Sequence, residues 1–202
     1  GILPFGASGN SGLCDEMVSP ACLSAAVAVG AVYHQENASP TTHYITDTVT
    51  CTDPTAQPDQ VACFVSRNDC IDLLAPFLVT TPTRGGGTWG FTGTSAASPH
   101  AAASAALLYQ AAGSATPMTP DLAVAILKST GKIASDLCGN GRPVPRIDAW
   151  AAVEQAISPT DCNSNGEPDV LEVGRGAAAD AALLGIETPA VAAHRGRPAA
   201  LR

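Results

Sequence analysis

Basic side chains and long apolar runs are both scarce in this sequence. It has ten Lys and Arg residues against 18 Asp and Glu residues, which gives a formal net charge of −8. This balance lacks the positive footprint with which proteins bind nucleic acid phosphates. Ser, His and Gln interrupt the longest apolar stretch before it reaches the length of a membrane span. We therefore expect neither a nucleic acid partner nor a membrane-spanning helix.

The sequence also lacks an initiator methionine and a signal peptide. Residues 1–5, Gly-Ile-Leu-Pro-Phe, read as the middle of a folded unit, so we expect that they are not the start of the gene product. The chain has 202 residues, of which 46% are hydrophobic and 14% are charged. These values exclude a disordered chain and predict one domain with a substantial core and an appendage.

Seven cysteines are many for a cytosolic chain of this size. Together with the few lysines and the acidic balance, they favour an oxidising setting outside the cytoplasm. The absence of a CxxC pair weakens the competing interpretation, a metal site. Cys14 with Cys22, and two of Cys51, Cys63 and Cys70, are plausible local disulfides. Because seven is odd, at least one thiol stays outside the intrachain pairs.

The segment from Gly93 to His100 reads Gly-Thr-Ser-Ala-Ala-Ser-Pro-His and leads into an uncharged, Ala-rich run that ends near Ala112. Gly93 suits a sharp turn, and Pro99 is tolerated in a first helical turn. The run predicts a buried helix, because it is apolar nearly all round. Ser95 lies in the first turn, where free N–H groups favour an anion. From its position alone, Ser95 reads most simply as a helix cap.

The ordered string Gly-Thr-Ser-x-x-x-Pro-His before an Ala-rich helix resembles the nucleophile segment of subtilisin-like serine proteases, the subtilases. The resemblance implies that Ser95 is the acylating nucleophile and that its N–H helps to bind the oxyanion. It also implies that Thr94 is near the substrate. His100 is five residues after Ser95 and on another face of the helix, so we expect a packed, hydrogen-bonded residue rather than the catalytic base.

A second match precedes this segment in the expected chain order. Residues 2–7 predict a buried strand, and a Gly/Asn turn follows at residues 8–12. From the residues alone, Asn10 is an ordinary turn residue. The resemblance implies that its side chain donates to the oxyanion and that Ala7, Ser8 and Gly9 form a wall of the substrate pocket. Ser8 stands where the family commonly has Ala.

Further matches extend the resemblance over residues 1–157. They are the apolar run from Ala25 to Val32, which predicts a strand buried on both faces, a short strand at 61–66, the segment 72–76, and two closing helices at about 120–129 and 150–157. Residues 34–60 read as a surface excursion, with His34 and His43 exposed. The implied fold class is α/β, a three-layer subtilisin-like fold with a mostly parallel sheet whose N-terminal part is missing here.

Two short regions follow that domain. Residues 158–173 include a stretch that fits the calcium loop pattern D-x-[DN]-x-[DN]-G-x5-E, against the alternative of a plain Asn/Gly turn. Its oxygen ligands are Asp161, Asn163, Asn165, Glu167, Asp169 and Glu172. We expect calcium there, with no cofactor needed for the chemistry. Residues 174–202 are rich in Ala, Gly, Arg and Pro, and we expect a low-complexity, disordered tail.

A subtilase needs Asp, His and Ser in that chain order, and only the Ser has its motif here. We therefore predict a fragment of a secreted serine endopeptidase. Its partners are a peptide substrate and the missing N-terminal half of the catalytic domain, without which the fragment is inactive. An α/β-hydrolase is disfavoured, because Gly-x-Ser-x-Gly is absent around Ser95. A non-catalytic, calcium-binding adhesion module derived from a protease is the alternative.

Overall fold

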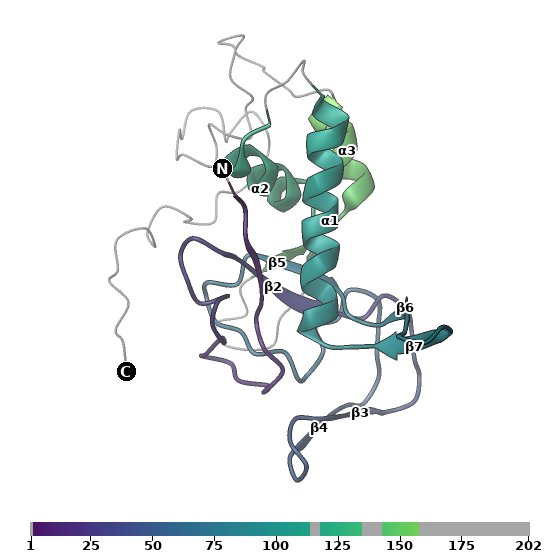
Figure 1. Ribbon diagram of the computed structural model, residues 1–202. Helices are drawn as coiled ribbons and strands as arrows, with labels where there is room; N and C mark the ends of the chain where they lie inside the picture. The colour runs from purple at the N-terminus through teal and green to yellow at the C-terminus, as the bar shows by residue number, and fades with distance from the viewer. Residues whose placement is uncertain (1, 114–117, 135–142, 158–202) are drawn as a thin grey trace.

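The computed structural model describes residues 2–113, 118–134 and 143–157. Its centre is a five-stranded sheet in the order β1-β2-β5-β9-β8, of which Figure 1 labels β2 and β5. Strands β1, β2, β5 and β9 run parallel, and β8 is antiparallel to β9. The strands are β1 (Phe5–Ala7), β2 (Val27–Val32), β5 (Leu73–Pro76), β8 (Lys132–Ala134) and β9 (Val144–Arg146). The predicted α/β class with a mostly parallel sheet is confirmed.

Strand β2 is the centre of the core, because all six of its residues are buried. Its continuous run of small apolar residues was the expected signature of a strand covered on both faces. Gly30 lies within it, and a Cβ there would approach Ile71 Cδ1 to 2.6 Å and Leu74 Cδ2 to 2.8 Å. The lack of a side chain at Gly30 therefore lets neighbouring side chains fill the space over the sheet.

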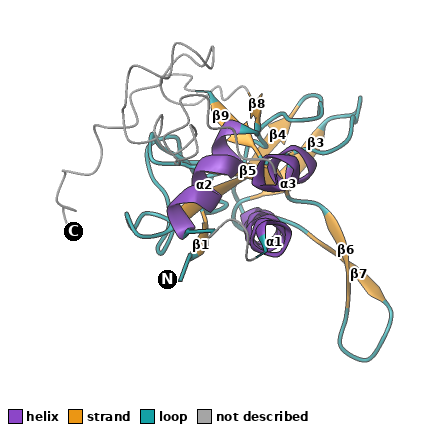
Figure 2. Ribbon diagram, turned by 90° about the horizontal axis from the view of Figure 1, so that it is seen from above, coloured by secondary structure: helices purple, strands orange, loops and turns teal. Residues whose placement is uncertain are grey.

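Three helices pack together beside the sheet (Figures 1 and 2). They are α1 (Thr94–Ala112), α2 (Pro120–Ser129) and α3 (Ala149–Ile157). Helix α1 contacts β1, β2 and β5, so it packs across three neighbouring strands of the sheet. The α2 boundary follows from its sequence, because Thr119 accepts a hydrogen bond from Leu122 N and Pro120 opens the helix. No helix in the described part of the chain is long and apolar enough to cross a membrane.

The expectation that α1 is buried all round is wrong for one of its sides. Ala101, Ala105 and Leu108 are buried against the sheet, whereas Leu107 and Tyr109 are 47% and 39% exposed. An uncharged helix can therefore keep an apolar side in contact with solvent in this chain. The sequence pattern could not distinguish a helix that is covered all round from one whose second side is uncovered.

Two hairpins extend from the body (Figures 1 and 2). One pairs β6 (Val79–Pro82) with β7 (Thr88–Phe91) and leads directly to α1. The other pairs β3 (Thr41–Tyr44) with β4 (Thr50–Asp53). The second hairpin lies inside the expected surface excursion at 34–60, and that interpretation was incomplete, because Asp53 and Ala56 are buried.

The predicted strand at 61–66 is wrong. Its only strand-like pairing is an isolated bridge between Val61 and Val32. Val65 N bonds to Ala62 O in a tight turn, and Ser66 N reaches Gly9 O. The backbone of this segment therefore bonds to itself, to the turn after β1 and, through Ala62 N, to Ala31 O of β2, without forming a ladder.

The cysteines confirm one predicted pairing and correct another. Cys51 and Cys63 form a disulfide, as expected for two of the three central cysteines, and Cys70 is free. The proposed pair of Cys14 with Cys22 is wrong, because Cys22 is free and the Cys14 sulfur is disulfide-bonded elsewhere. Spacing alone could not exclude that pair.

Candidate active site

The turn after β1 and the start of α1 meet, although more than 80 residues separate them in the sequence. Gly9 N donates to Thr94 Oγ1 at 3.2 Å. Thr94 N and Thr94 Oγ1 both donate to Asn10 Oδ1 at 2.9 Å. These three hydrogen bonds hold the Asn10 side chain next to the first turn of α1. The two motifs that the family resemblance singled out therefore lie side by side.

The Asn10 side chain has its oxygen satisfied and its nitrogen unused. Both hydrogen bonds from Thr94 go to Oδ1, and Nδ2 has no partner among the described residues. The same bonds fix the orientation of the amide, because a flipped group would place its NH₂ against two donors. Asn10 is exposed, so its free N–H groups face a solvent-accessible position. This arrangement can donate to an oxyanion.

Position 93 requires glycine for two reasons, its backbone conformation and the closeness of the Asn10 side chain. Its φ is +96°, in the region that favours glycine. A Cβ at Gly93 would also lie 2.9 Å from Asn10 Nδ2. A side chain at this position would therefore both strain the backbone and cover the free donor.

Ser95 is exposed, and its hydroxyl makes no hydrogen bond within the described part of the chain. The N-cap of α1 is Gly93, whose carbonyl accepts from Ala96 N at 2.9 Å and from Ala97 N at 3.3 Å. The simple interpretation of Ser95 as a cap is therefore wrong. As the second residue of the helix, Ser95 has a backbone N–H with no intrahelical acceptor. Ser95 thus has a free hydroxyl and a free N–H, and the residue before it, Thr94, holds the Asn10 amide.

The predicted pocket residues are largely inaccessible through their side chains. Thr94 is 1% exposed and Ser8 is 0% exposed. Ser8 Oγ is buried and has no hydrogen-bond partner in the described structure. Gly9 is buried, and Ala7 is half-buried. Their role in substrate binding stays a prediction, and for Ser8 and Gly9 the backbone is the part that could serve it.

The described histidines do not form a base for Ser95. His100 is half-buried, and its Nδ1 lies 2.8 Å from Ala96 O, so the expected packed, hydrogen-bonded role is confirmed. His34 is exposed as predicted. The expected exposure of His43 is wrong, because its side chain is 17% exposed and it packs edge-on against Phe64 and Phe77.

Sequence reasoning missed a polar cluster around His43. Tyr33 Oη lies 2.7 Å from His43 Nε2 and donates to Asp53 Oδ2 at 2.8 Å. Burial lowers the pKa of His43 more than the nearby Asp53 carboxylate raises it, and burial with the Asp53 hydrogen bond raises the pKa of Tyr33. No local motif marks these residues, which come from the end of β2 and from both strands of the second hairpin.

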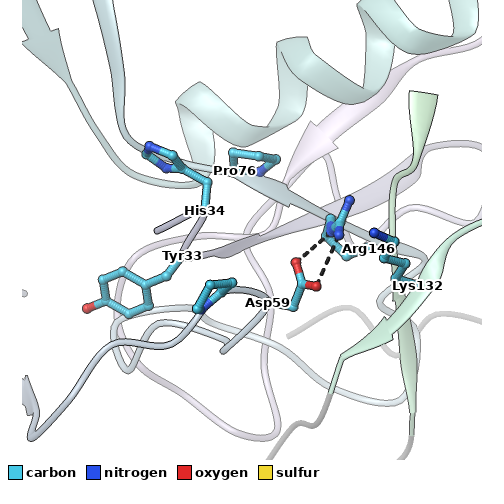
Figure 3. A pocket seen from close by; sticks show the side chains of 7 residues that line it. Tyr33, His34, Asp59, Pro76, Lys132 and Arg146 are labelled. Atoms are coloured by element: carbon cyan, nitrogen blue, oxygen red, sulfur yellow. Dashed lines mark hydrogen bonds and ion pairs between the residues drawn. The ribbon is translucent and has the colours of Figure 1, made fainter. Parts of the chain in front are cut away.

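A separate pocket of about 290 Å³ lies at the carboxyl ends of the parallel strands (Figure 3). It is lined by Tyr33, His34, Pro58, Asp59, Pro76, Lys132 and Arg146. The Arg146 guanidinium is paired with the Asp59 carboxylate by two bonds, at 2.6 and 3.0 Å. The pocket contains neither Ser95 nor Asn10. The predicted calcium ligands Asp161, Asn163, Asn165, Glu167, Asp169 and Glu172 lie outside the described residues.

The chain is similar to a known protein family and to several solved structures. The model of the subtilase family, a peptidase family, matches residues 1–142. No curated protein matches the sequence. Among solved structures, the chain is similar to the prenylagaramide maturation protease PagA, with 23% identity and a TM-score of 0.55 over 77% of this chain and 50% of that one.

Two further solved structures show the same fold. A protease from Pseudoalteromonas arctica is 24% identical, with a TM-score of 0.50 over 74% of this chain and 41% of that one. The protease domain of PatA is 22% identical, with a TM-score of 0.52 over 74% of this chain and 46% of that one. The chain therefore spans about half the length, or less, of the solved structures that it matches. With its family model matched over residues 1–142, the chain belongs to the subtilase family.

Proposed function

We propose that this chain carries the nucleophile and the oxyanion site of a secreted serine endopeptidase. The observation that supports this most directly is the Asn10–Thr94–Ser95 arrangement, in which Thr94 holds the Asn10 side chain with its amide N–H groups unused, and the next residue, Ser95, has an unbonded hydroxyl and N–H. Proteolysis would proceed by acyl transfer. Ser95 Oγ attacks the peptide carbonyl carbon, and Asn10 Nδ2 and Ser95 N donate to the oxygen that becomes negative.

The reaction also needs a base to take the Ser95 proton. His100 Nδ1 is bonded to its own helix, and His43 Nε2 is bonded to Tyr33 Oη. We propose that an Asp and a His from another segment of the same catalytic domain provide the base. The apolar side of α1 and the unpaired edge of β1 in the described sheet offer surfaces on which such a segment would pack. Without it, the 202-residue chain would be inactive.

The substrate class is a peptide or protein. Ala7, Ser8 and Gly9 would form a wall of the pocket for the side chain before the scissile bond, mostly through backbone atoms, since Ser8 is fully buried. An extracellular location is supported by the Cys51–Cys63 disulfide, because such bonds persist in oxidising compartments. The loop at 161–172 would bind calcium without taking part in the chemistry.

An active-site serine probe tests the proposal. The 202-residue chain and the complete gene product are each treated with a fluorophosphonate, and the labelled residue is identified by mass spectrometry. We expect labelling of Ser95 in the complete product, little in the shorter chain, and none in S95A variants of either. Strong labelling of Ser95 in the 202-residue chain would contradict the need for another segment.

The same experiment separates the protease from its alternative. If the complete product has its Asp and His motifs and Ser95 still remains unlabelled, the protease proposal is wrong. A complete product that lacks those motifs, is unlabelled and binds calcium through 161–172 would be the non-catalytic adhesion module. Calcium binding is measured by calorimetry, with E172Q as the variant that removes the bidentate ligand and E154Q, the same change at an exposed position outside the loop, as the matched control.

A further inference from the structure

The polar cluster around His43 has the composition of a transition-metal site. His43, Asp53 and Cys63 each offer one ligand atom, and these three atoms lie within 4.8 Å of one another. They come from β3, from the end of β4 and from the loop after it. Imidazole nitrogen, carboxylate oxygen and thiolate sulfur together form a ligand set suited to Zn²⁺.

The geometry is close to what tetrahedral zinc requires. With metal–ligand distances of about 2.0–2.3 Å, neighbouring ligand atoms in a tetrahedral site lie roughly 3.5 Å apart. His43 Nε2 and Asp53 Oδ2 are already 3.7 Å apart. Cys63 Sγ lies within 4.8 Å of both atoms, so it would have to approach them on binding, and a water molecule can take the fourth position.

The surroundings of the cluster would support a bound cation. Asp53 is 6% exposed, and its Oδ2 accepts from Cys63 N at 3.0 Å, which holds the carboxylate beside the sulfur. Phe64 and Phe77 pack against the His43 ring and orient it.

The disulfide decides whether the site is available. Cys63 is bonded to Cys51, and a disulfide sulfur is not the thiolate that zinc needs. We propose that reduction of the Cys51–Cys63 disulfide converts this cluster into a zinc site formed by His43, Asp53 and Cys63. The oxidised chain keeps the same three residues as a hydrogen-bonded cluster without metal.

The zinc site would form in two steps, reduction of the disulfide and then binding of the metal. A phosphine reductant attacks the disulfide, and with one water molecule this gives the phosphine oxide and two thiols. Zinc then displaces the proton from Cys63 Sγ. Tyr33 has a single hydroxyl proton, which it donates in the hydrogen bond to Asp53 Oδ2. His43 Nε2 must therefore be the donor in its own hydrogen bond to Tyr33 Oη. Binding through Nε2 therefore also moves that proton to Nδ1 and breaks the bond to Tyr33.

Cobalt titration of the full 202-residue chain tests the proposal, because Co²⁺ replaces Zn²⁺ and its absorption reports thiolate coordination. The oxidised chain should show no thiolate-to-cobalt charge-transfer band. After reduction with a phosphine under nitrogen, one equivalent of Co²⁺ should bind, and Zn²⁺ should displace it. Reduced H43Q and D53N should each bind at least about tenfold more weakly, whereas H34Q, which changes an exposed histidine, should bind as the unchanged chain does.

A C51A variant gives a second route to the site, since it leaves Cys63 as a thiol with no reductant added. It should bind Co²⁺, and C51A/H43Q should not. Circular dichroism of each variant shows whether it is folded. The proposal is overturned if folded C51A binds no Co²⁺, if H43Q and D53N bind as tightly as the unchanged chain, or if the oxidised chain gives the same band. Equally tight binding in H43Q and D53N would assign the metal to other thiols.

Discussion

At the scale of single residues, Thr94 is the side chain that joins the two halves of the candidate site. Its hydroxyl donates to Asn10 Oδ1 and accepts from Gly9 N, and the side chain is almost fully buried. T94V keeps the shape and removes both bonds, which leaves the Gly9 N–H unpaired. We expect a loss of about 1–3 kcal/mol in the free energy of unfolding, measured with urea. T94S, which keeps the hydroxyl, should lose much less, and equal losses would mean that the methyl group matters instead.

His43 gives stability a dependence on pH. Burial lowers its pKa in the folded chain, so the unfolded chain binds a proton more readily. The free energy of unfolding should therefore be highest above the usual histidine pKa of about 6.5 and should fall as the pH is lowered through that value. Urea unfolding between pH 7.5 and pH 5, with a chelator present, measures this.

The control for that prediction is a matched pair of histidine variants. H43Q should flatten the slope, whereas H34Q, at an exposed position, should leave it unchanged. A slope that survives in H43Q would assign the pH dependence to other groups.

At the scale of elements, strands β1 and β2 differ in how closely they are covered. A Cβ at Gly6 in β1 would lie 2.8 Å from Ala21 Cα and 2.9 Å from Ala21 N, which are backbone atoms. At Gly30 in β2 the nearest atoms are the ends of the Ile71 and Leu74 side chains, which can turn away. We expect G6A to cost more than G30A, with overpacking costs of about 1–3 kcal/mol. Thermal unfolding compares them, and a larger loss in G30A would show that the core over β2 is the stiffer of the two.

At the scale of the whole molecule, the Cys51–Cys63 disulfide ties the second hairpin to the segment before β5 and closes a loop with a sequence separation of 12. A closed loop of this length restricts the conformations of the unfolded chain and so raises its free energy by roughly 3 kcal/mol. C51A/C63A should therefore unfold at a clearly lower urea concentration than the unchanged chain. C22A/C70A, which removes the two free, exposed thiols among the described residues, should unfold at the same concentration as the unchanged chain. A double variant at 51 and 63 that is as stable as the unchanged chain would mean that the hairpin is held by its other contacts.

Much of the fold could be predicted because its signals are local. The buried run at 27–32 needs no partner to read as a covered strand, and Thr119-Pro120 starts α2 wherever it lies. The segment at 61–66 looked equally strand-like, yet its backbone hydrogen bonds are divided among its own turn, the turn after β1 and a single bond to β2. Propensity cannot predict which distant backbone will accept a hydrogen bond.

The sequence by itself determined the family and the candidate site of this protein, because the Ser95 and Asn10 motifs are short, ordered strings read in chain order. Only the tertiary structure decided that Asn10 Oδ1 is used by Thr94 while Nδ2 stays free, that Ser95 is not a cap, and that His43 is enclosed with Asp53 and Cys63. The physical reason is that hydrogen bonding and burial depend on which distant segments meet. That meeting is set by the packing of α1 and the hairpins on the sheet, which no local pattern specifies.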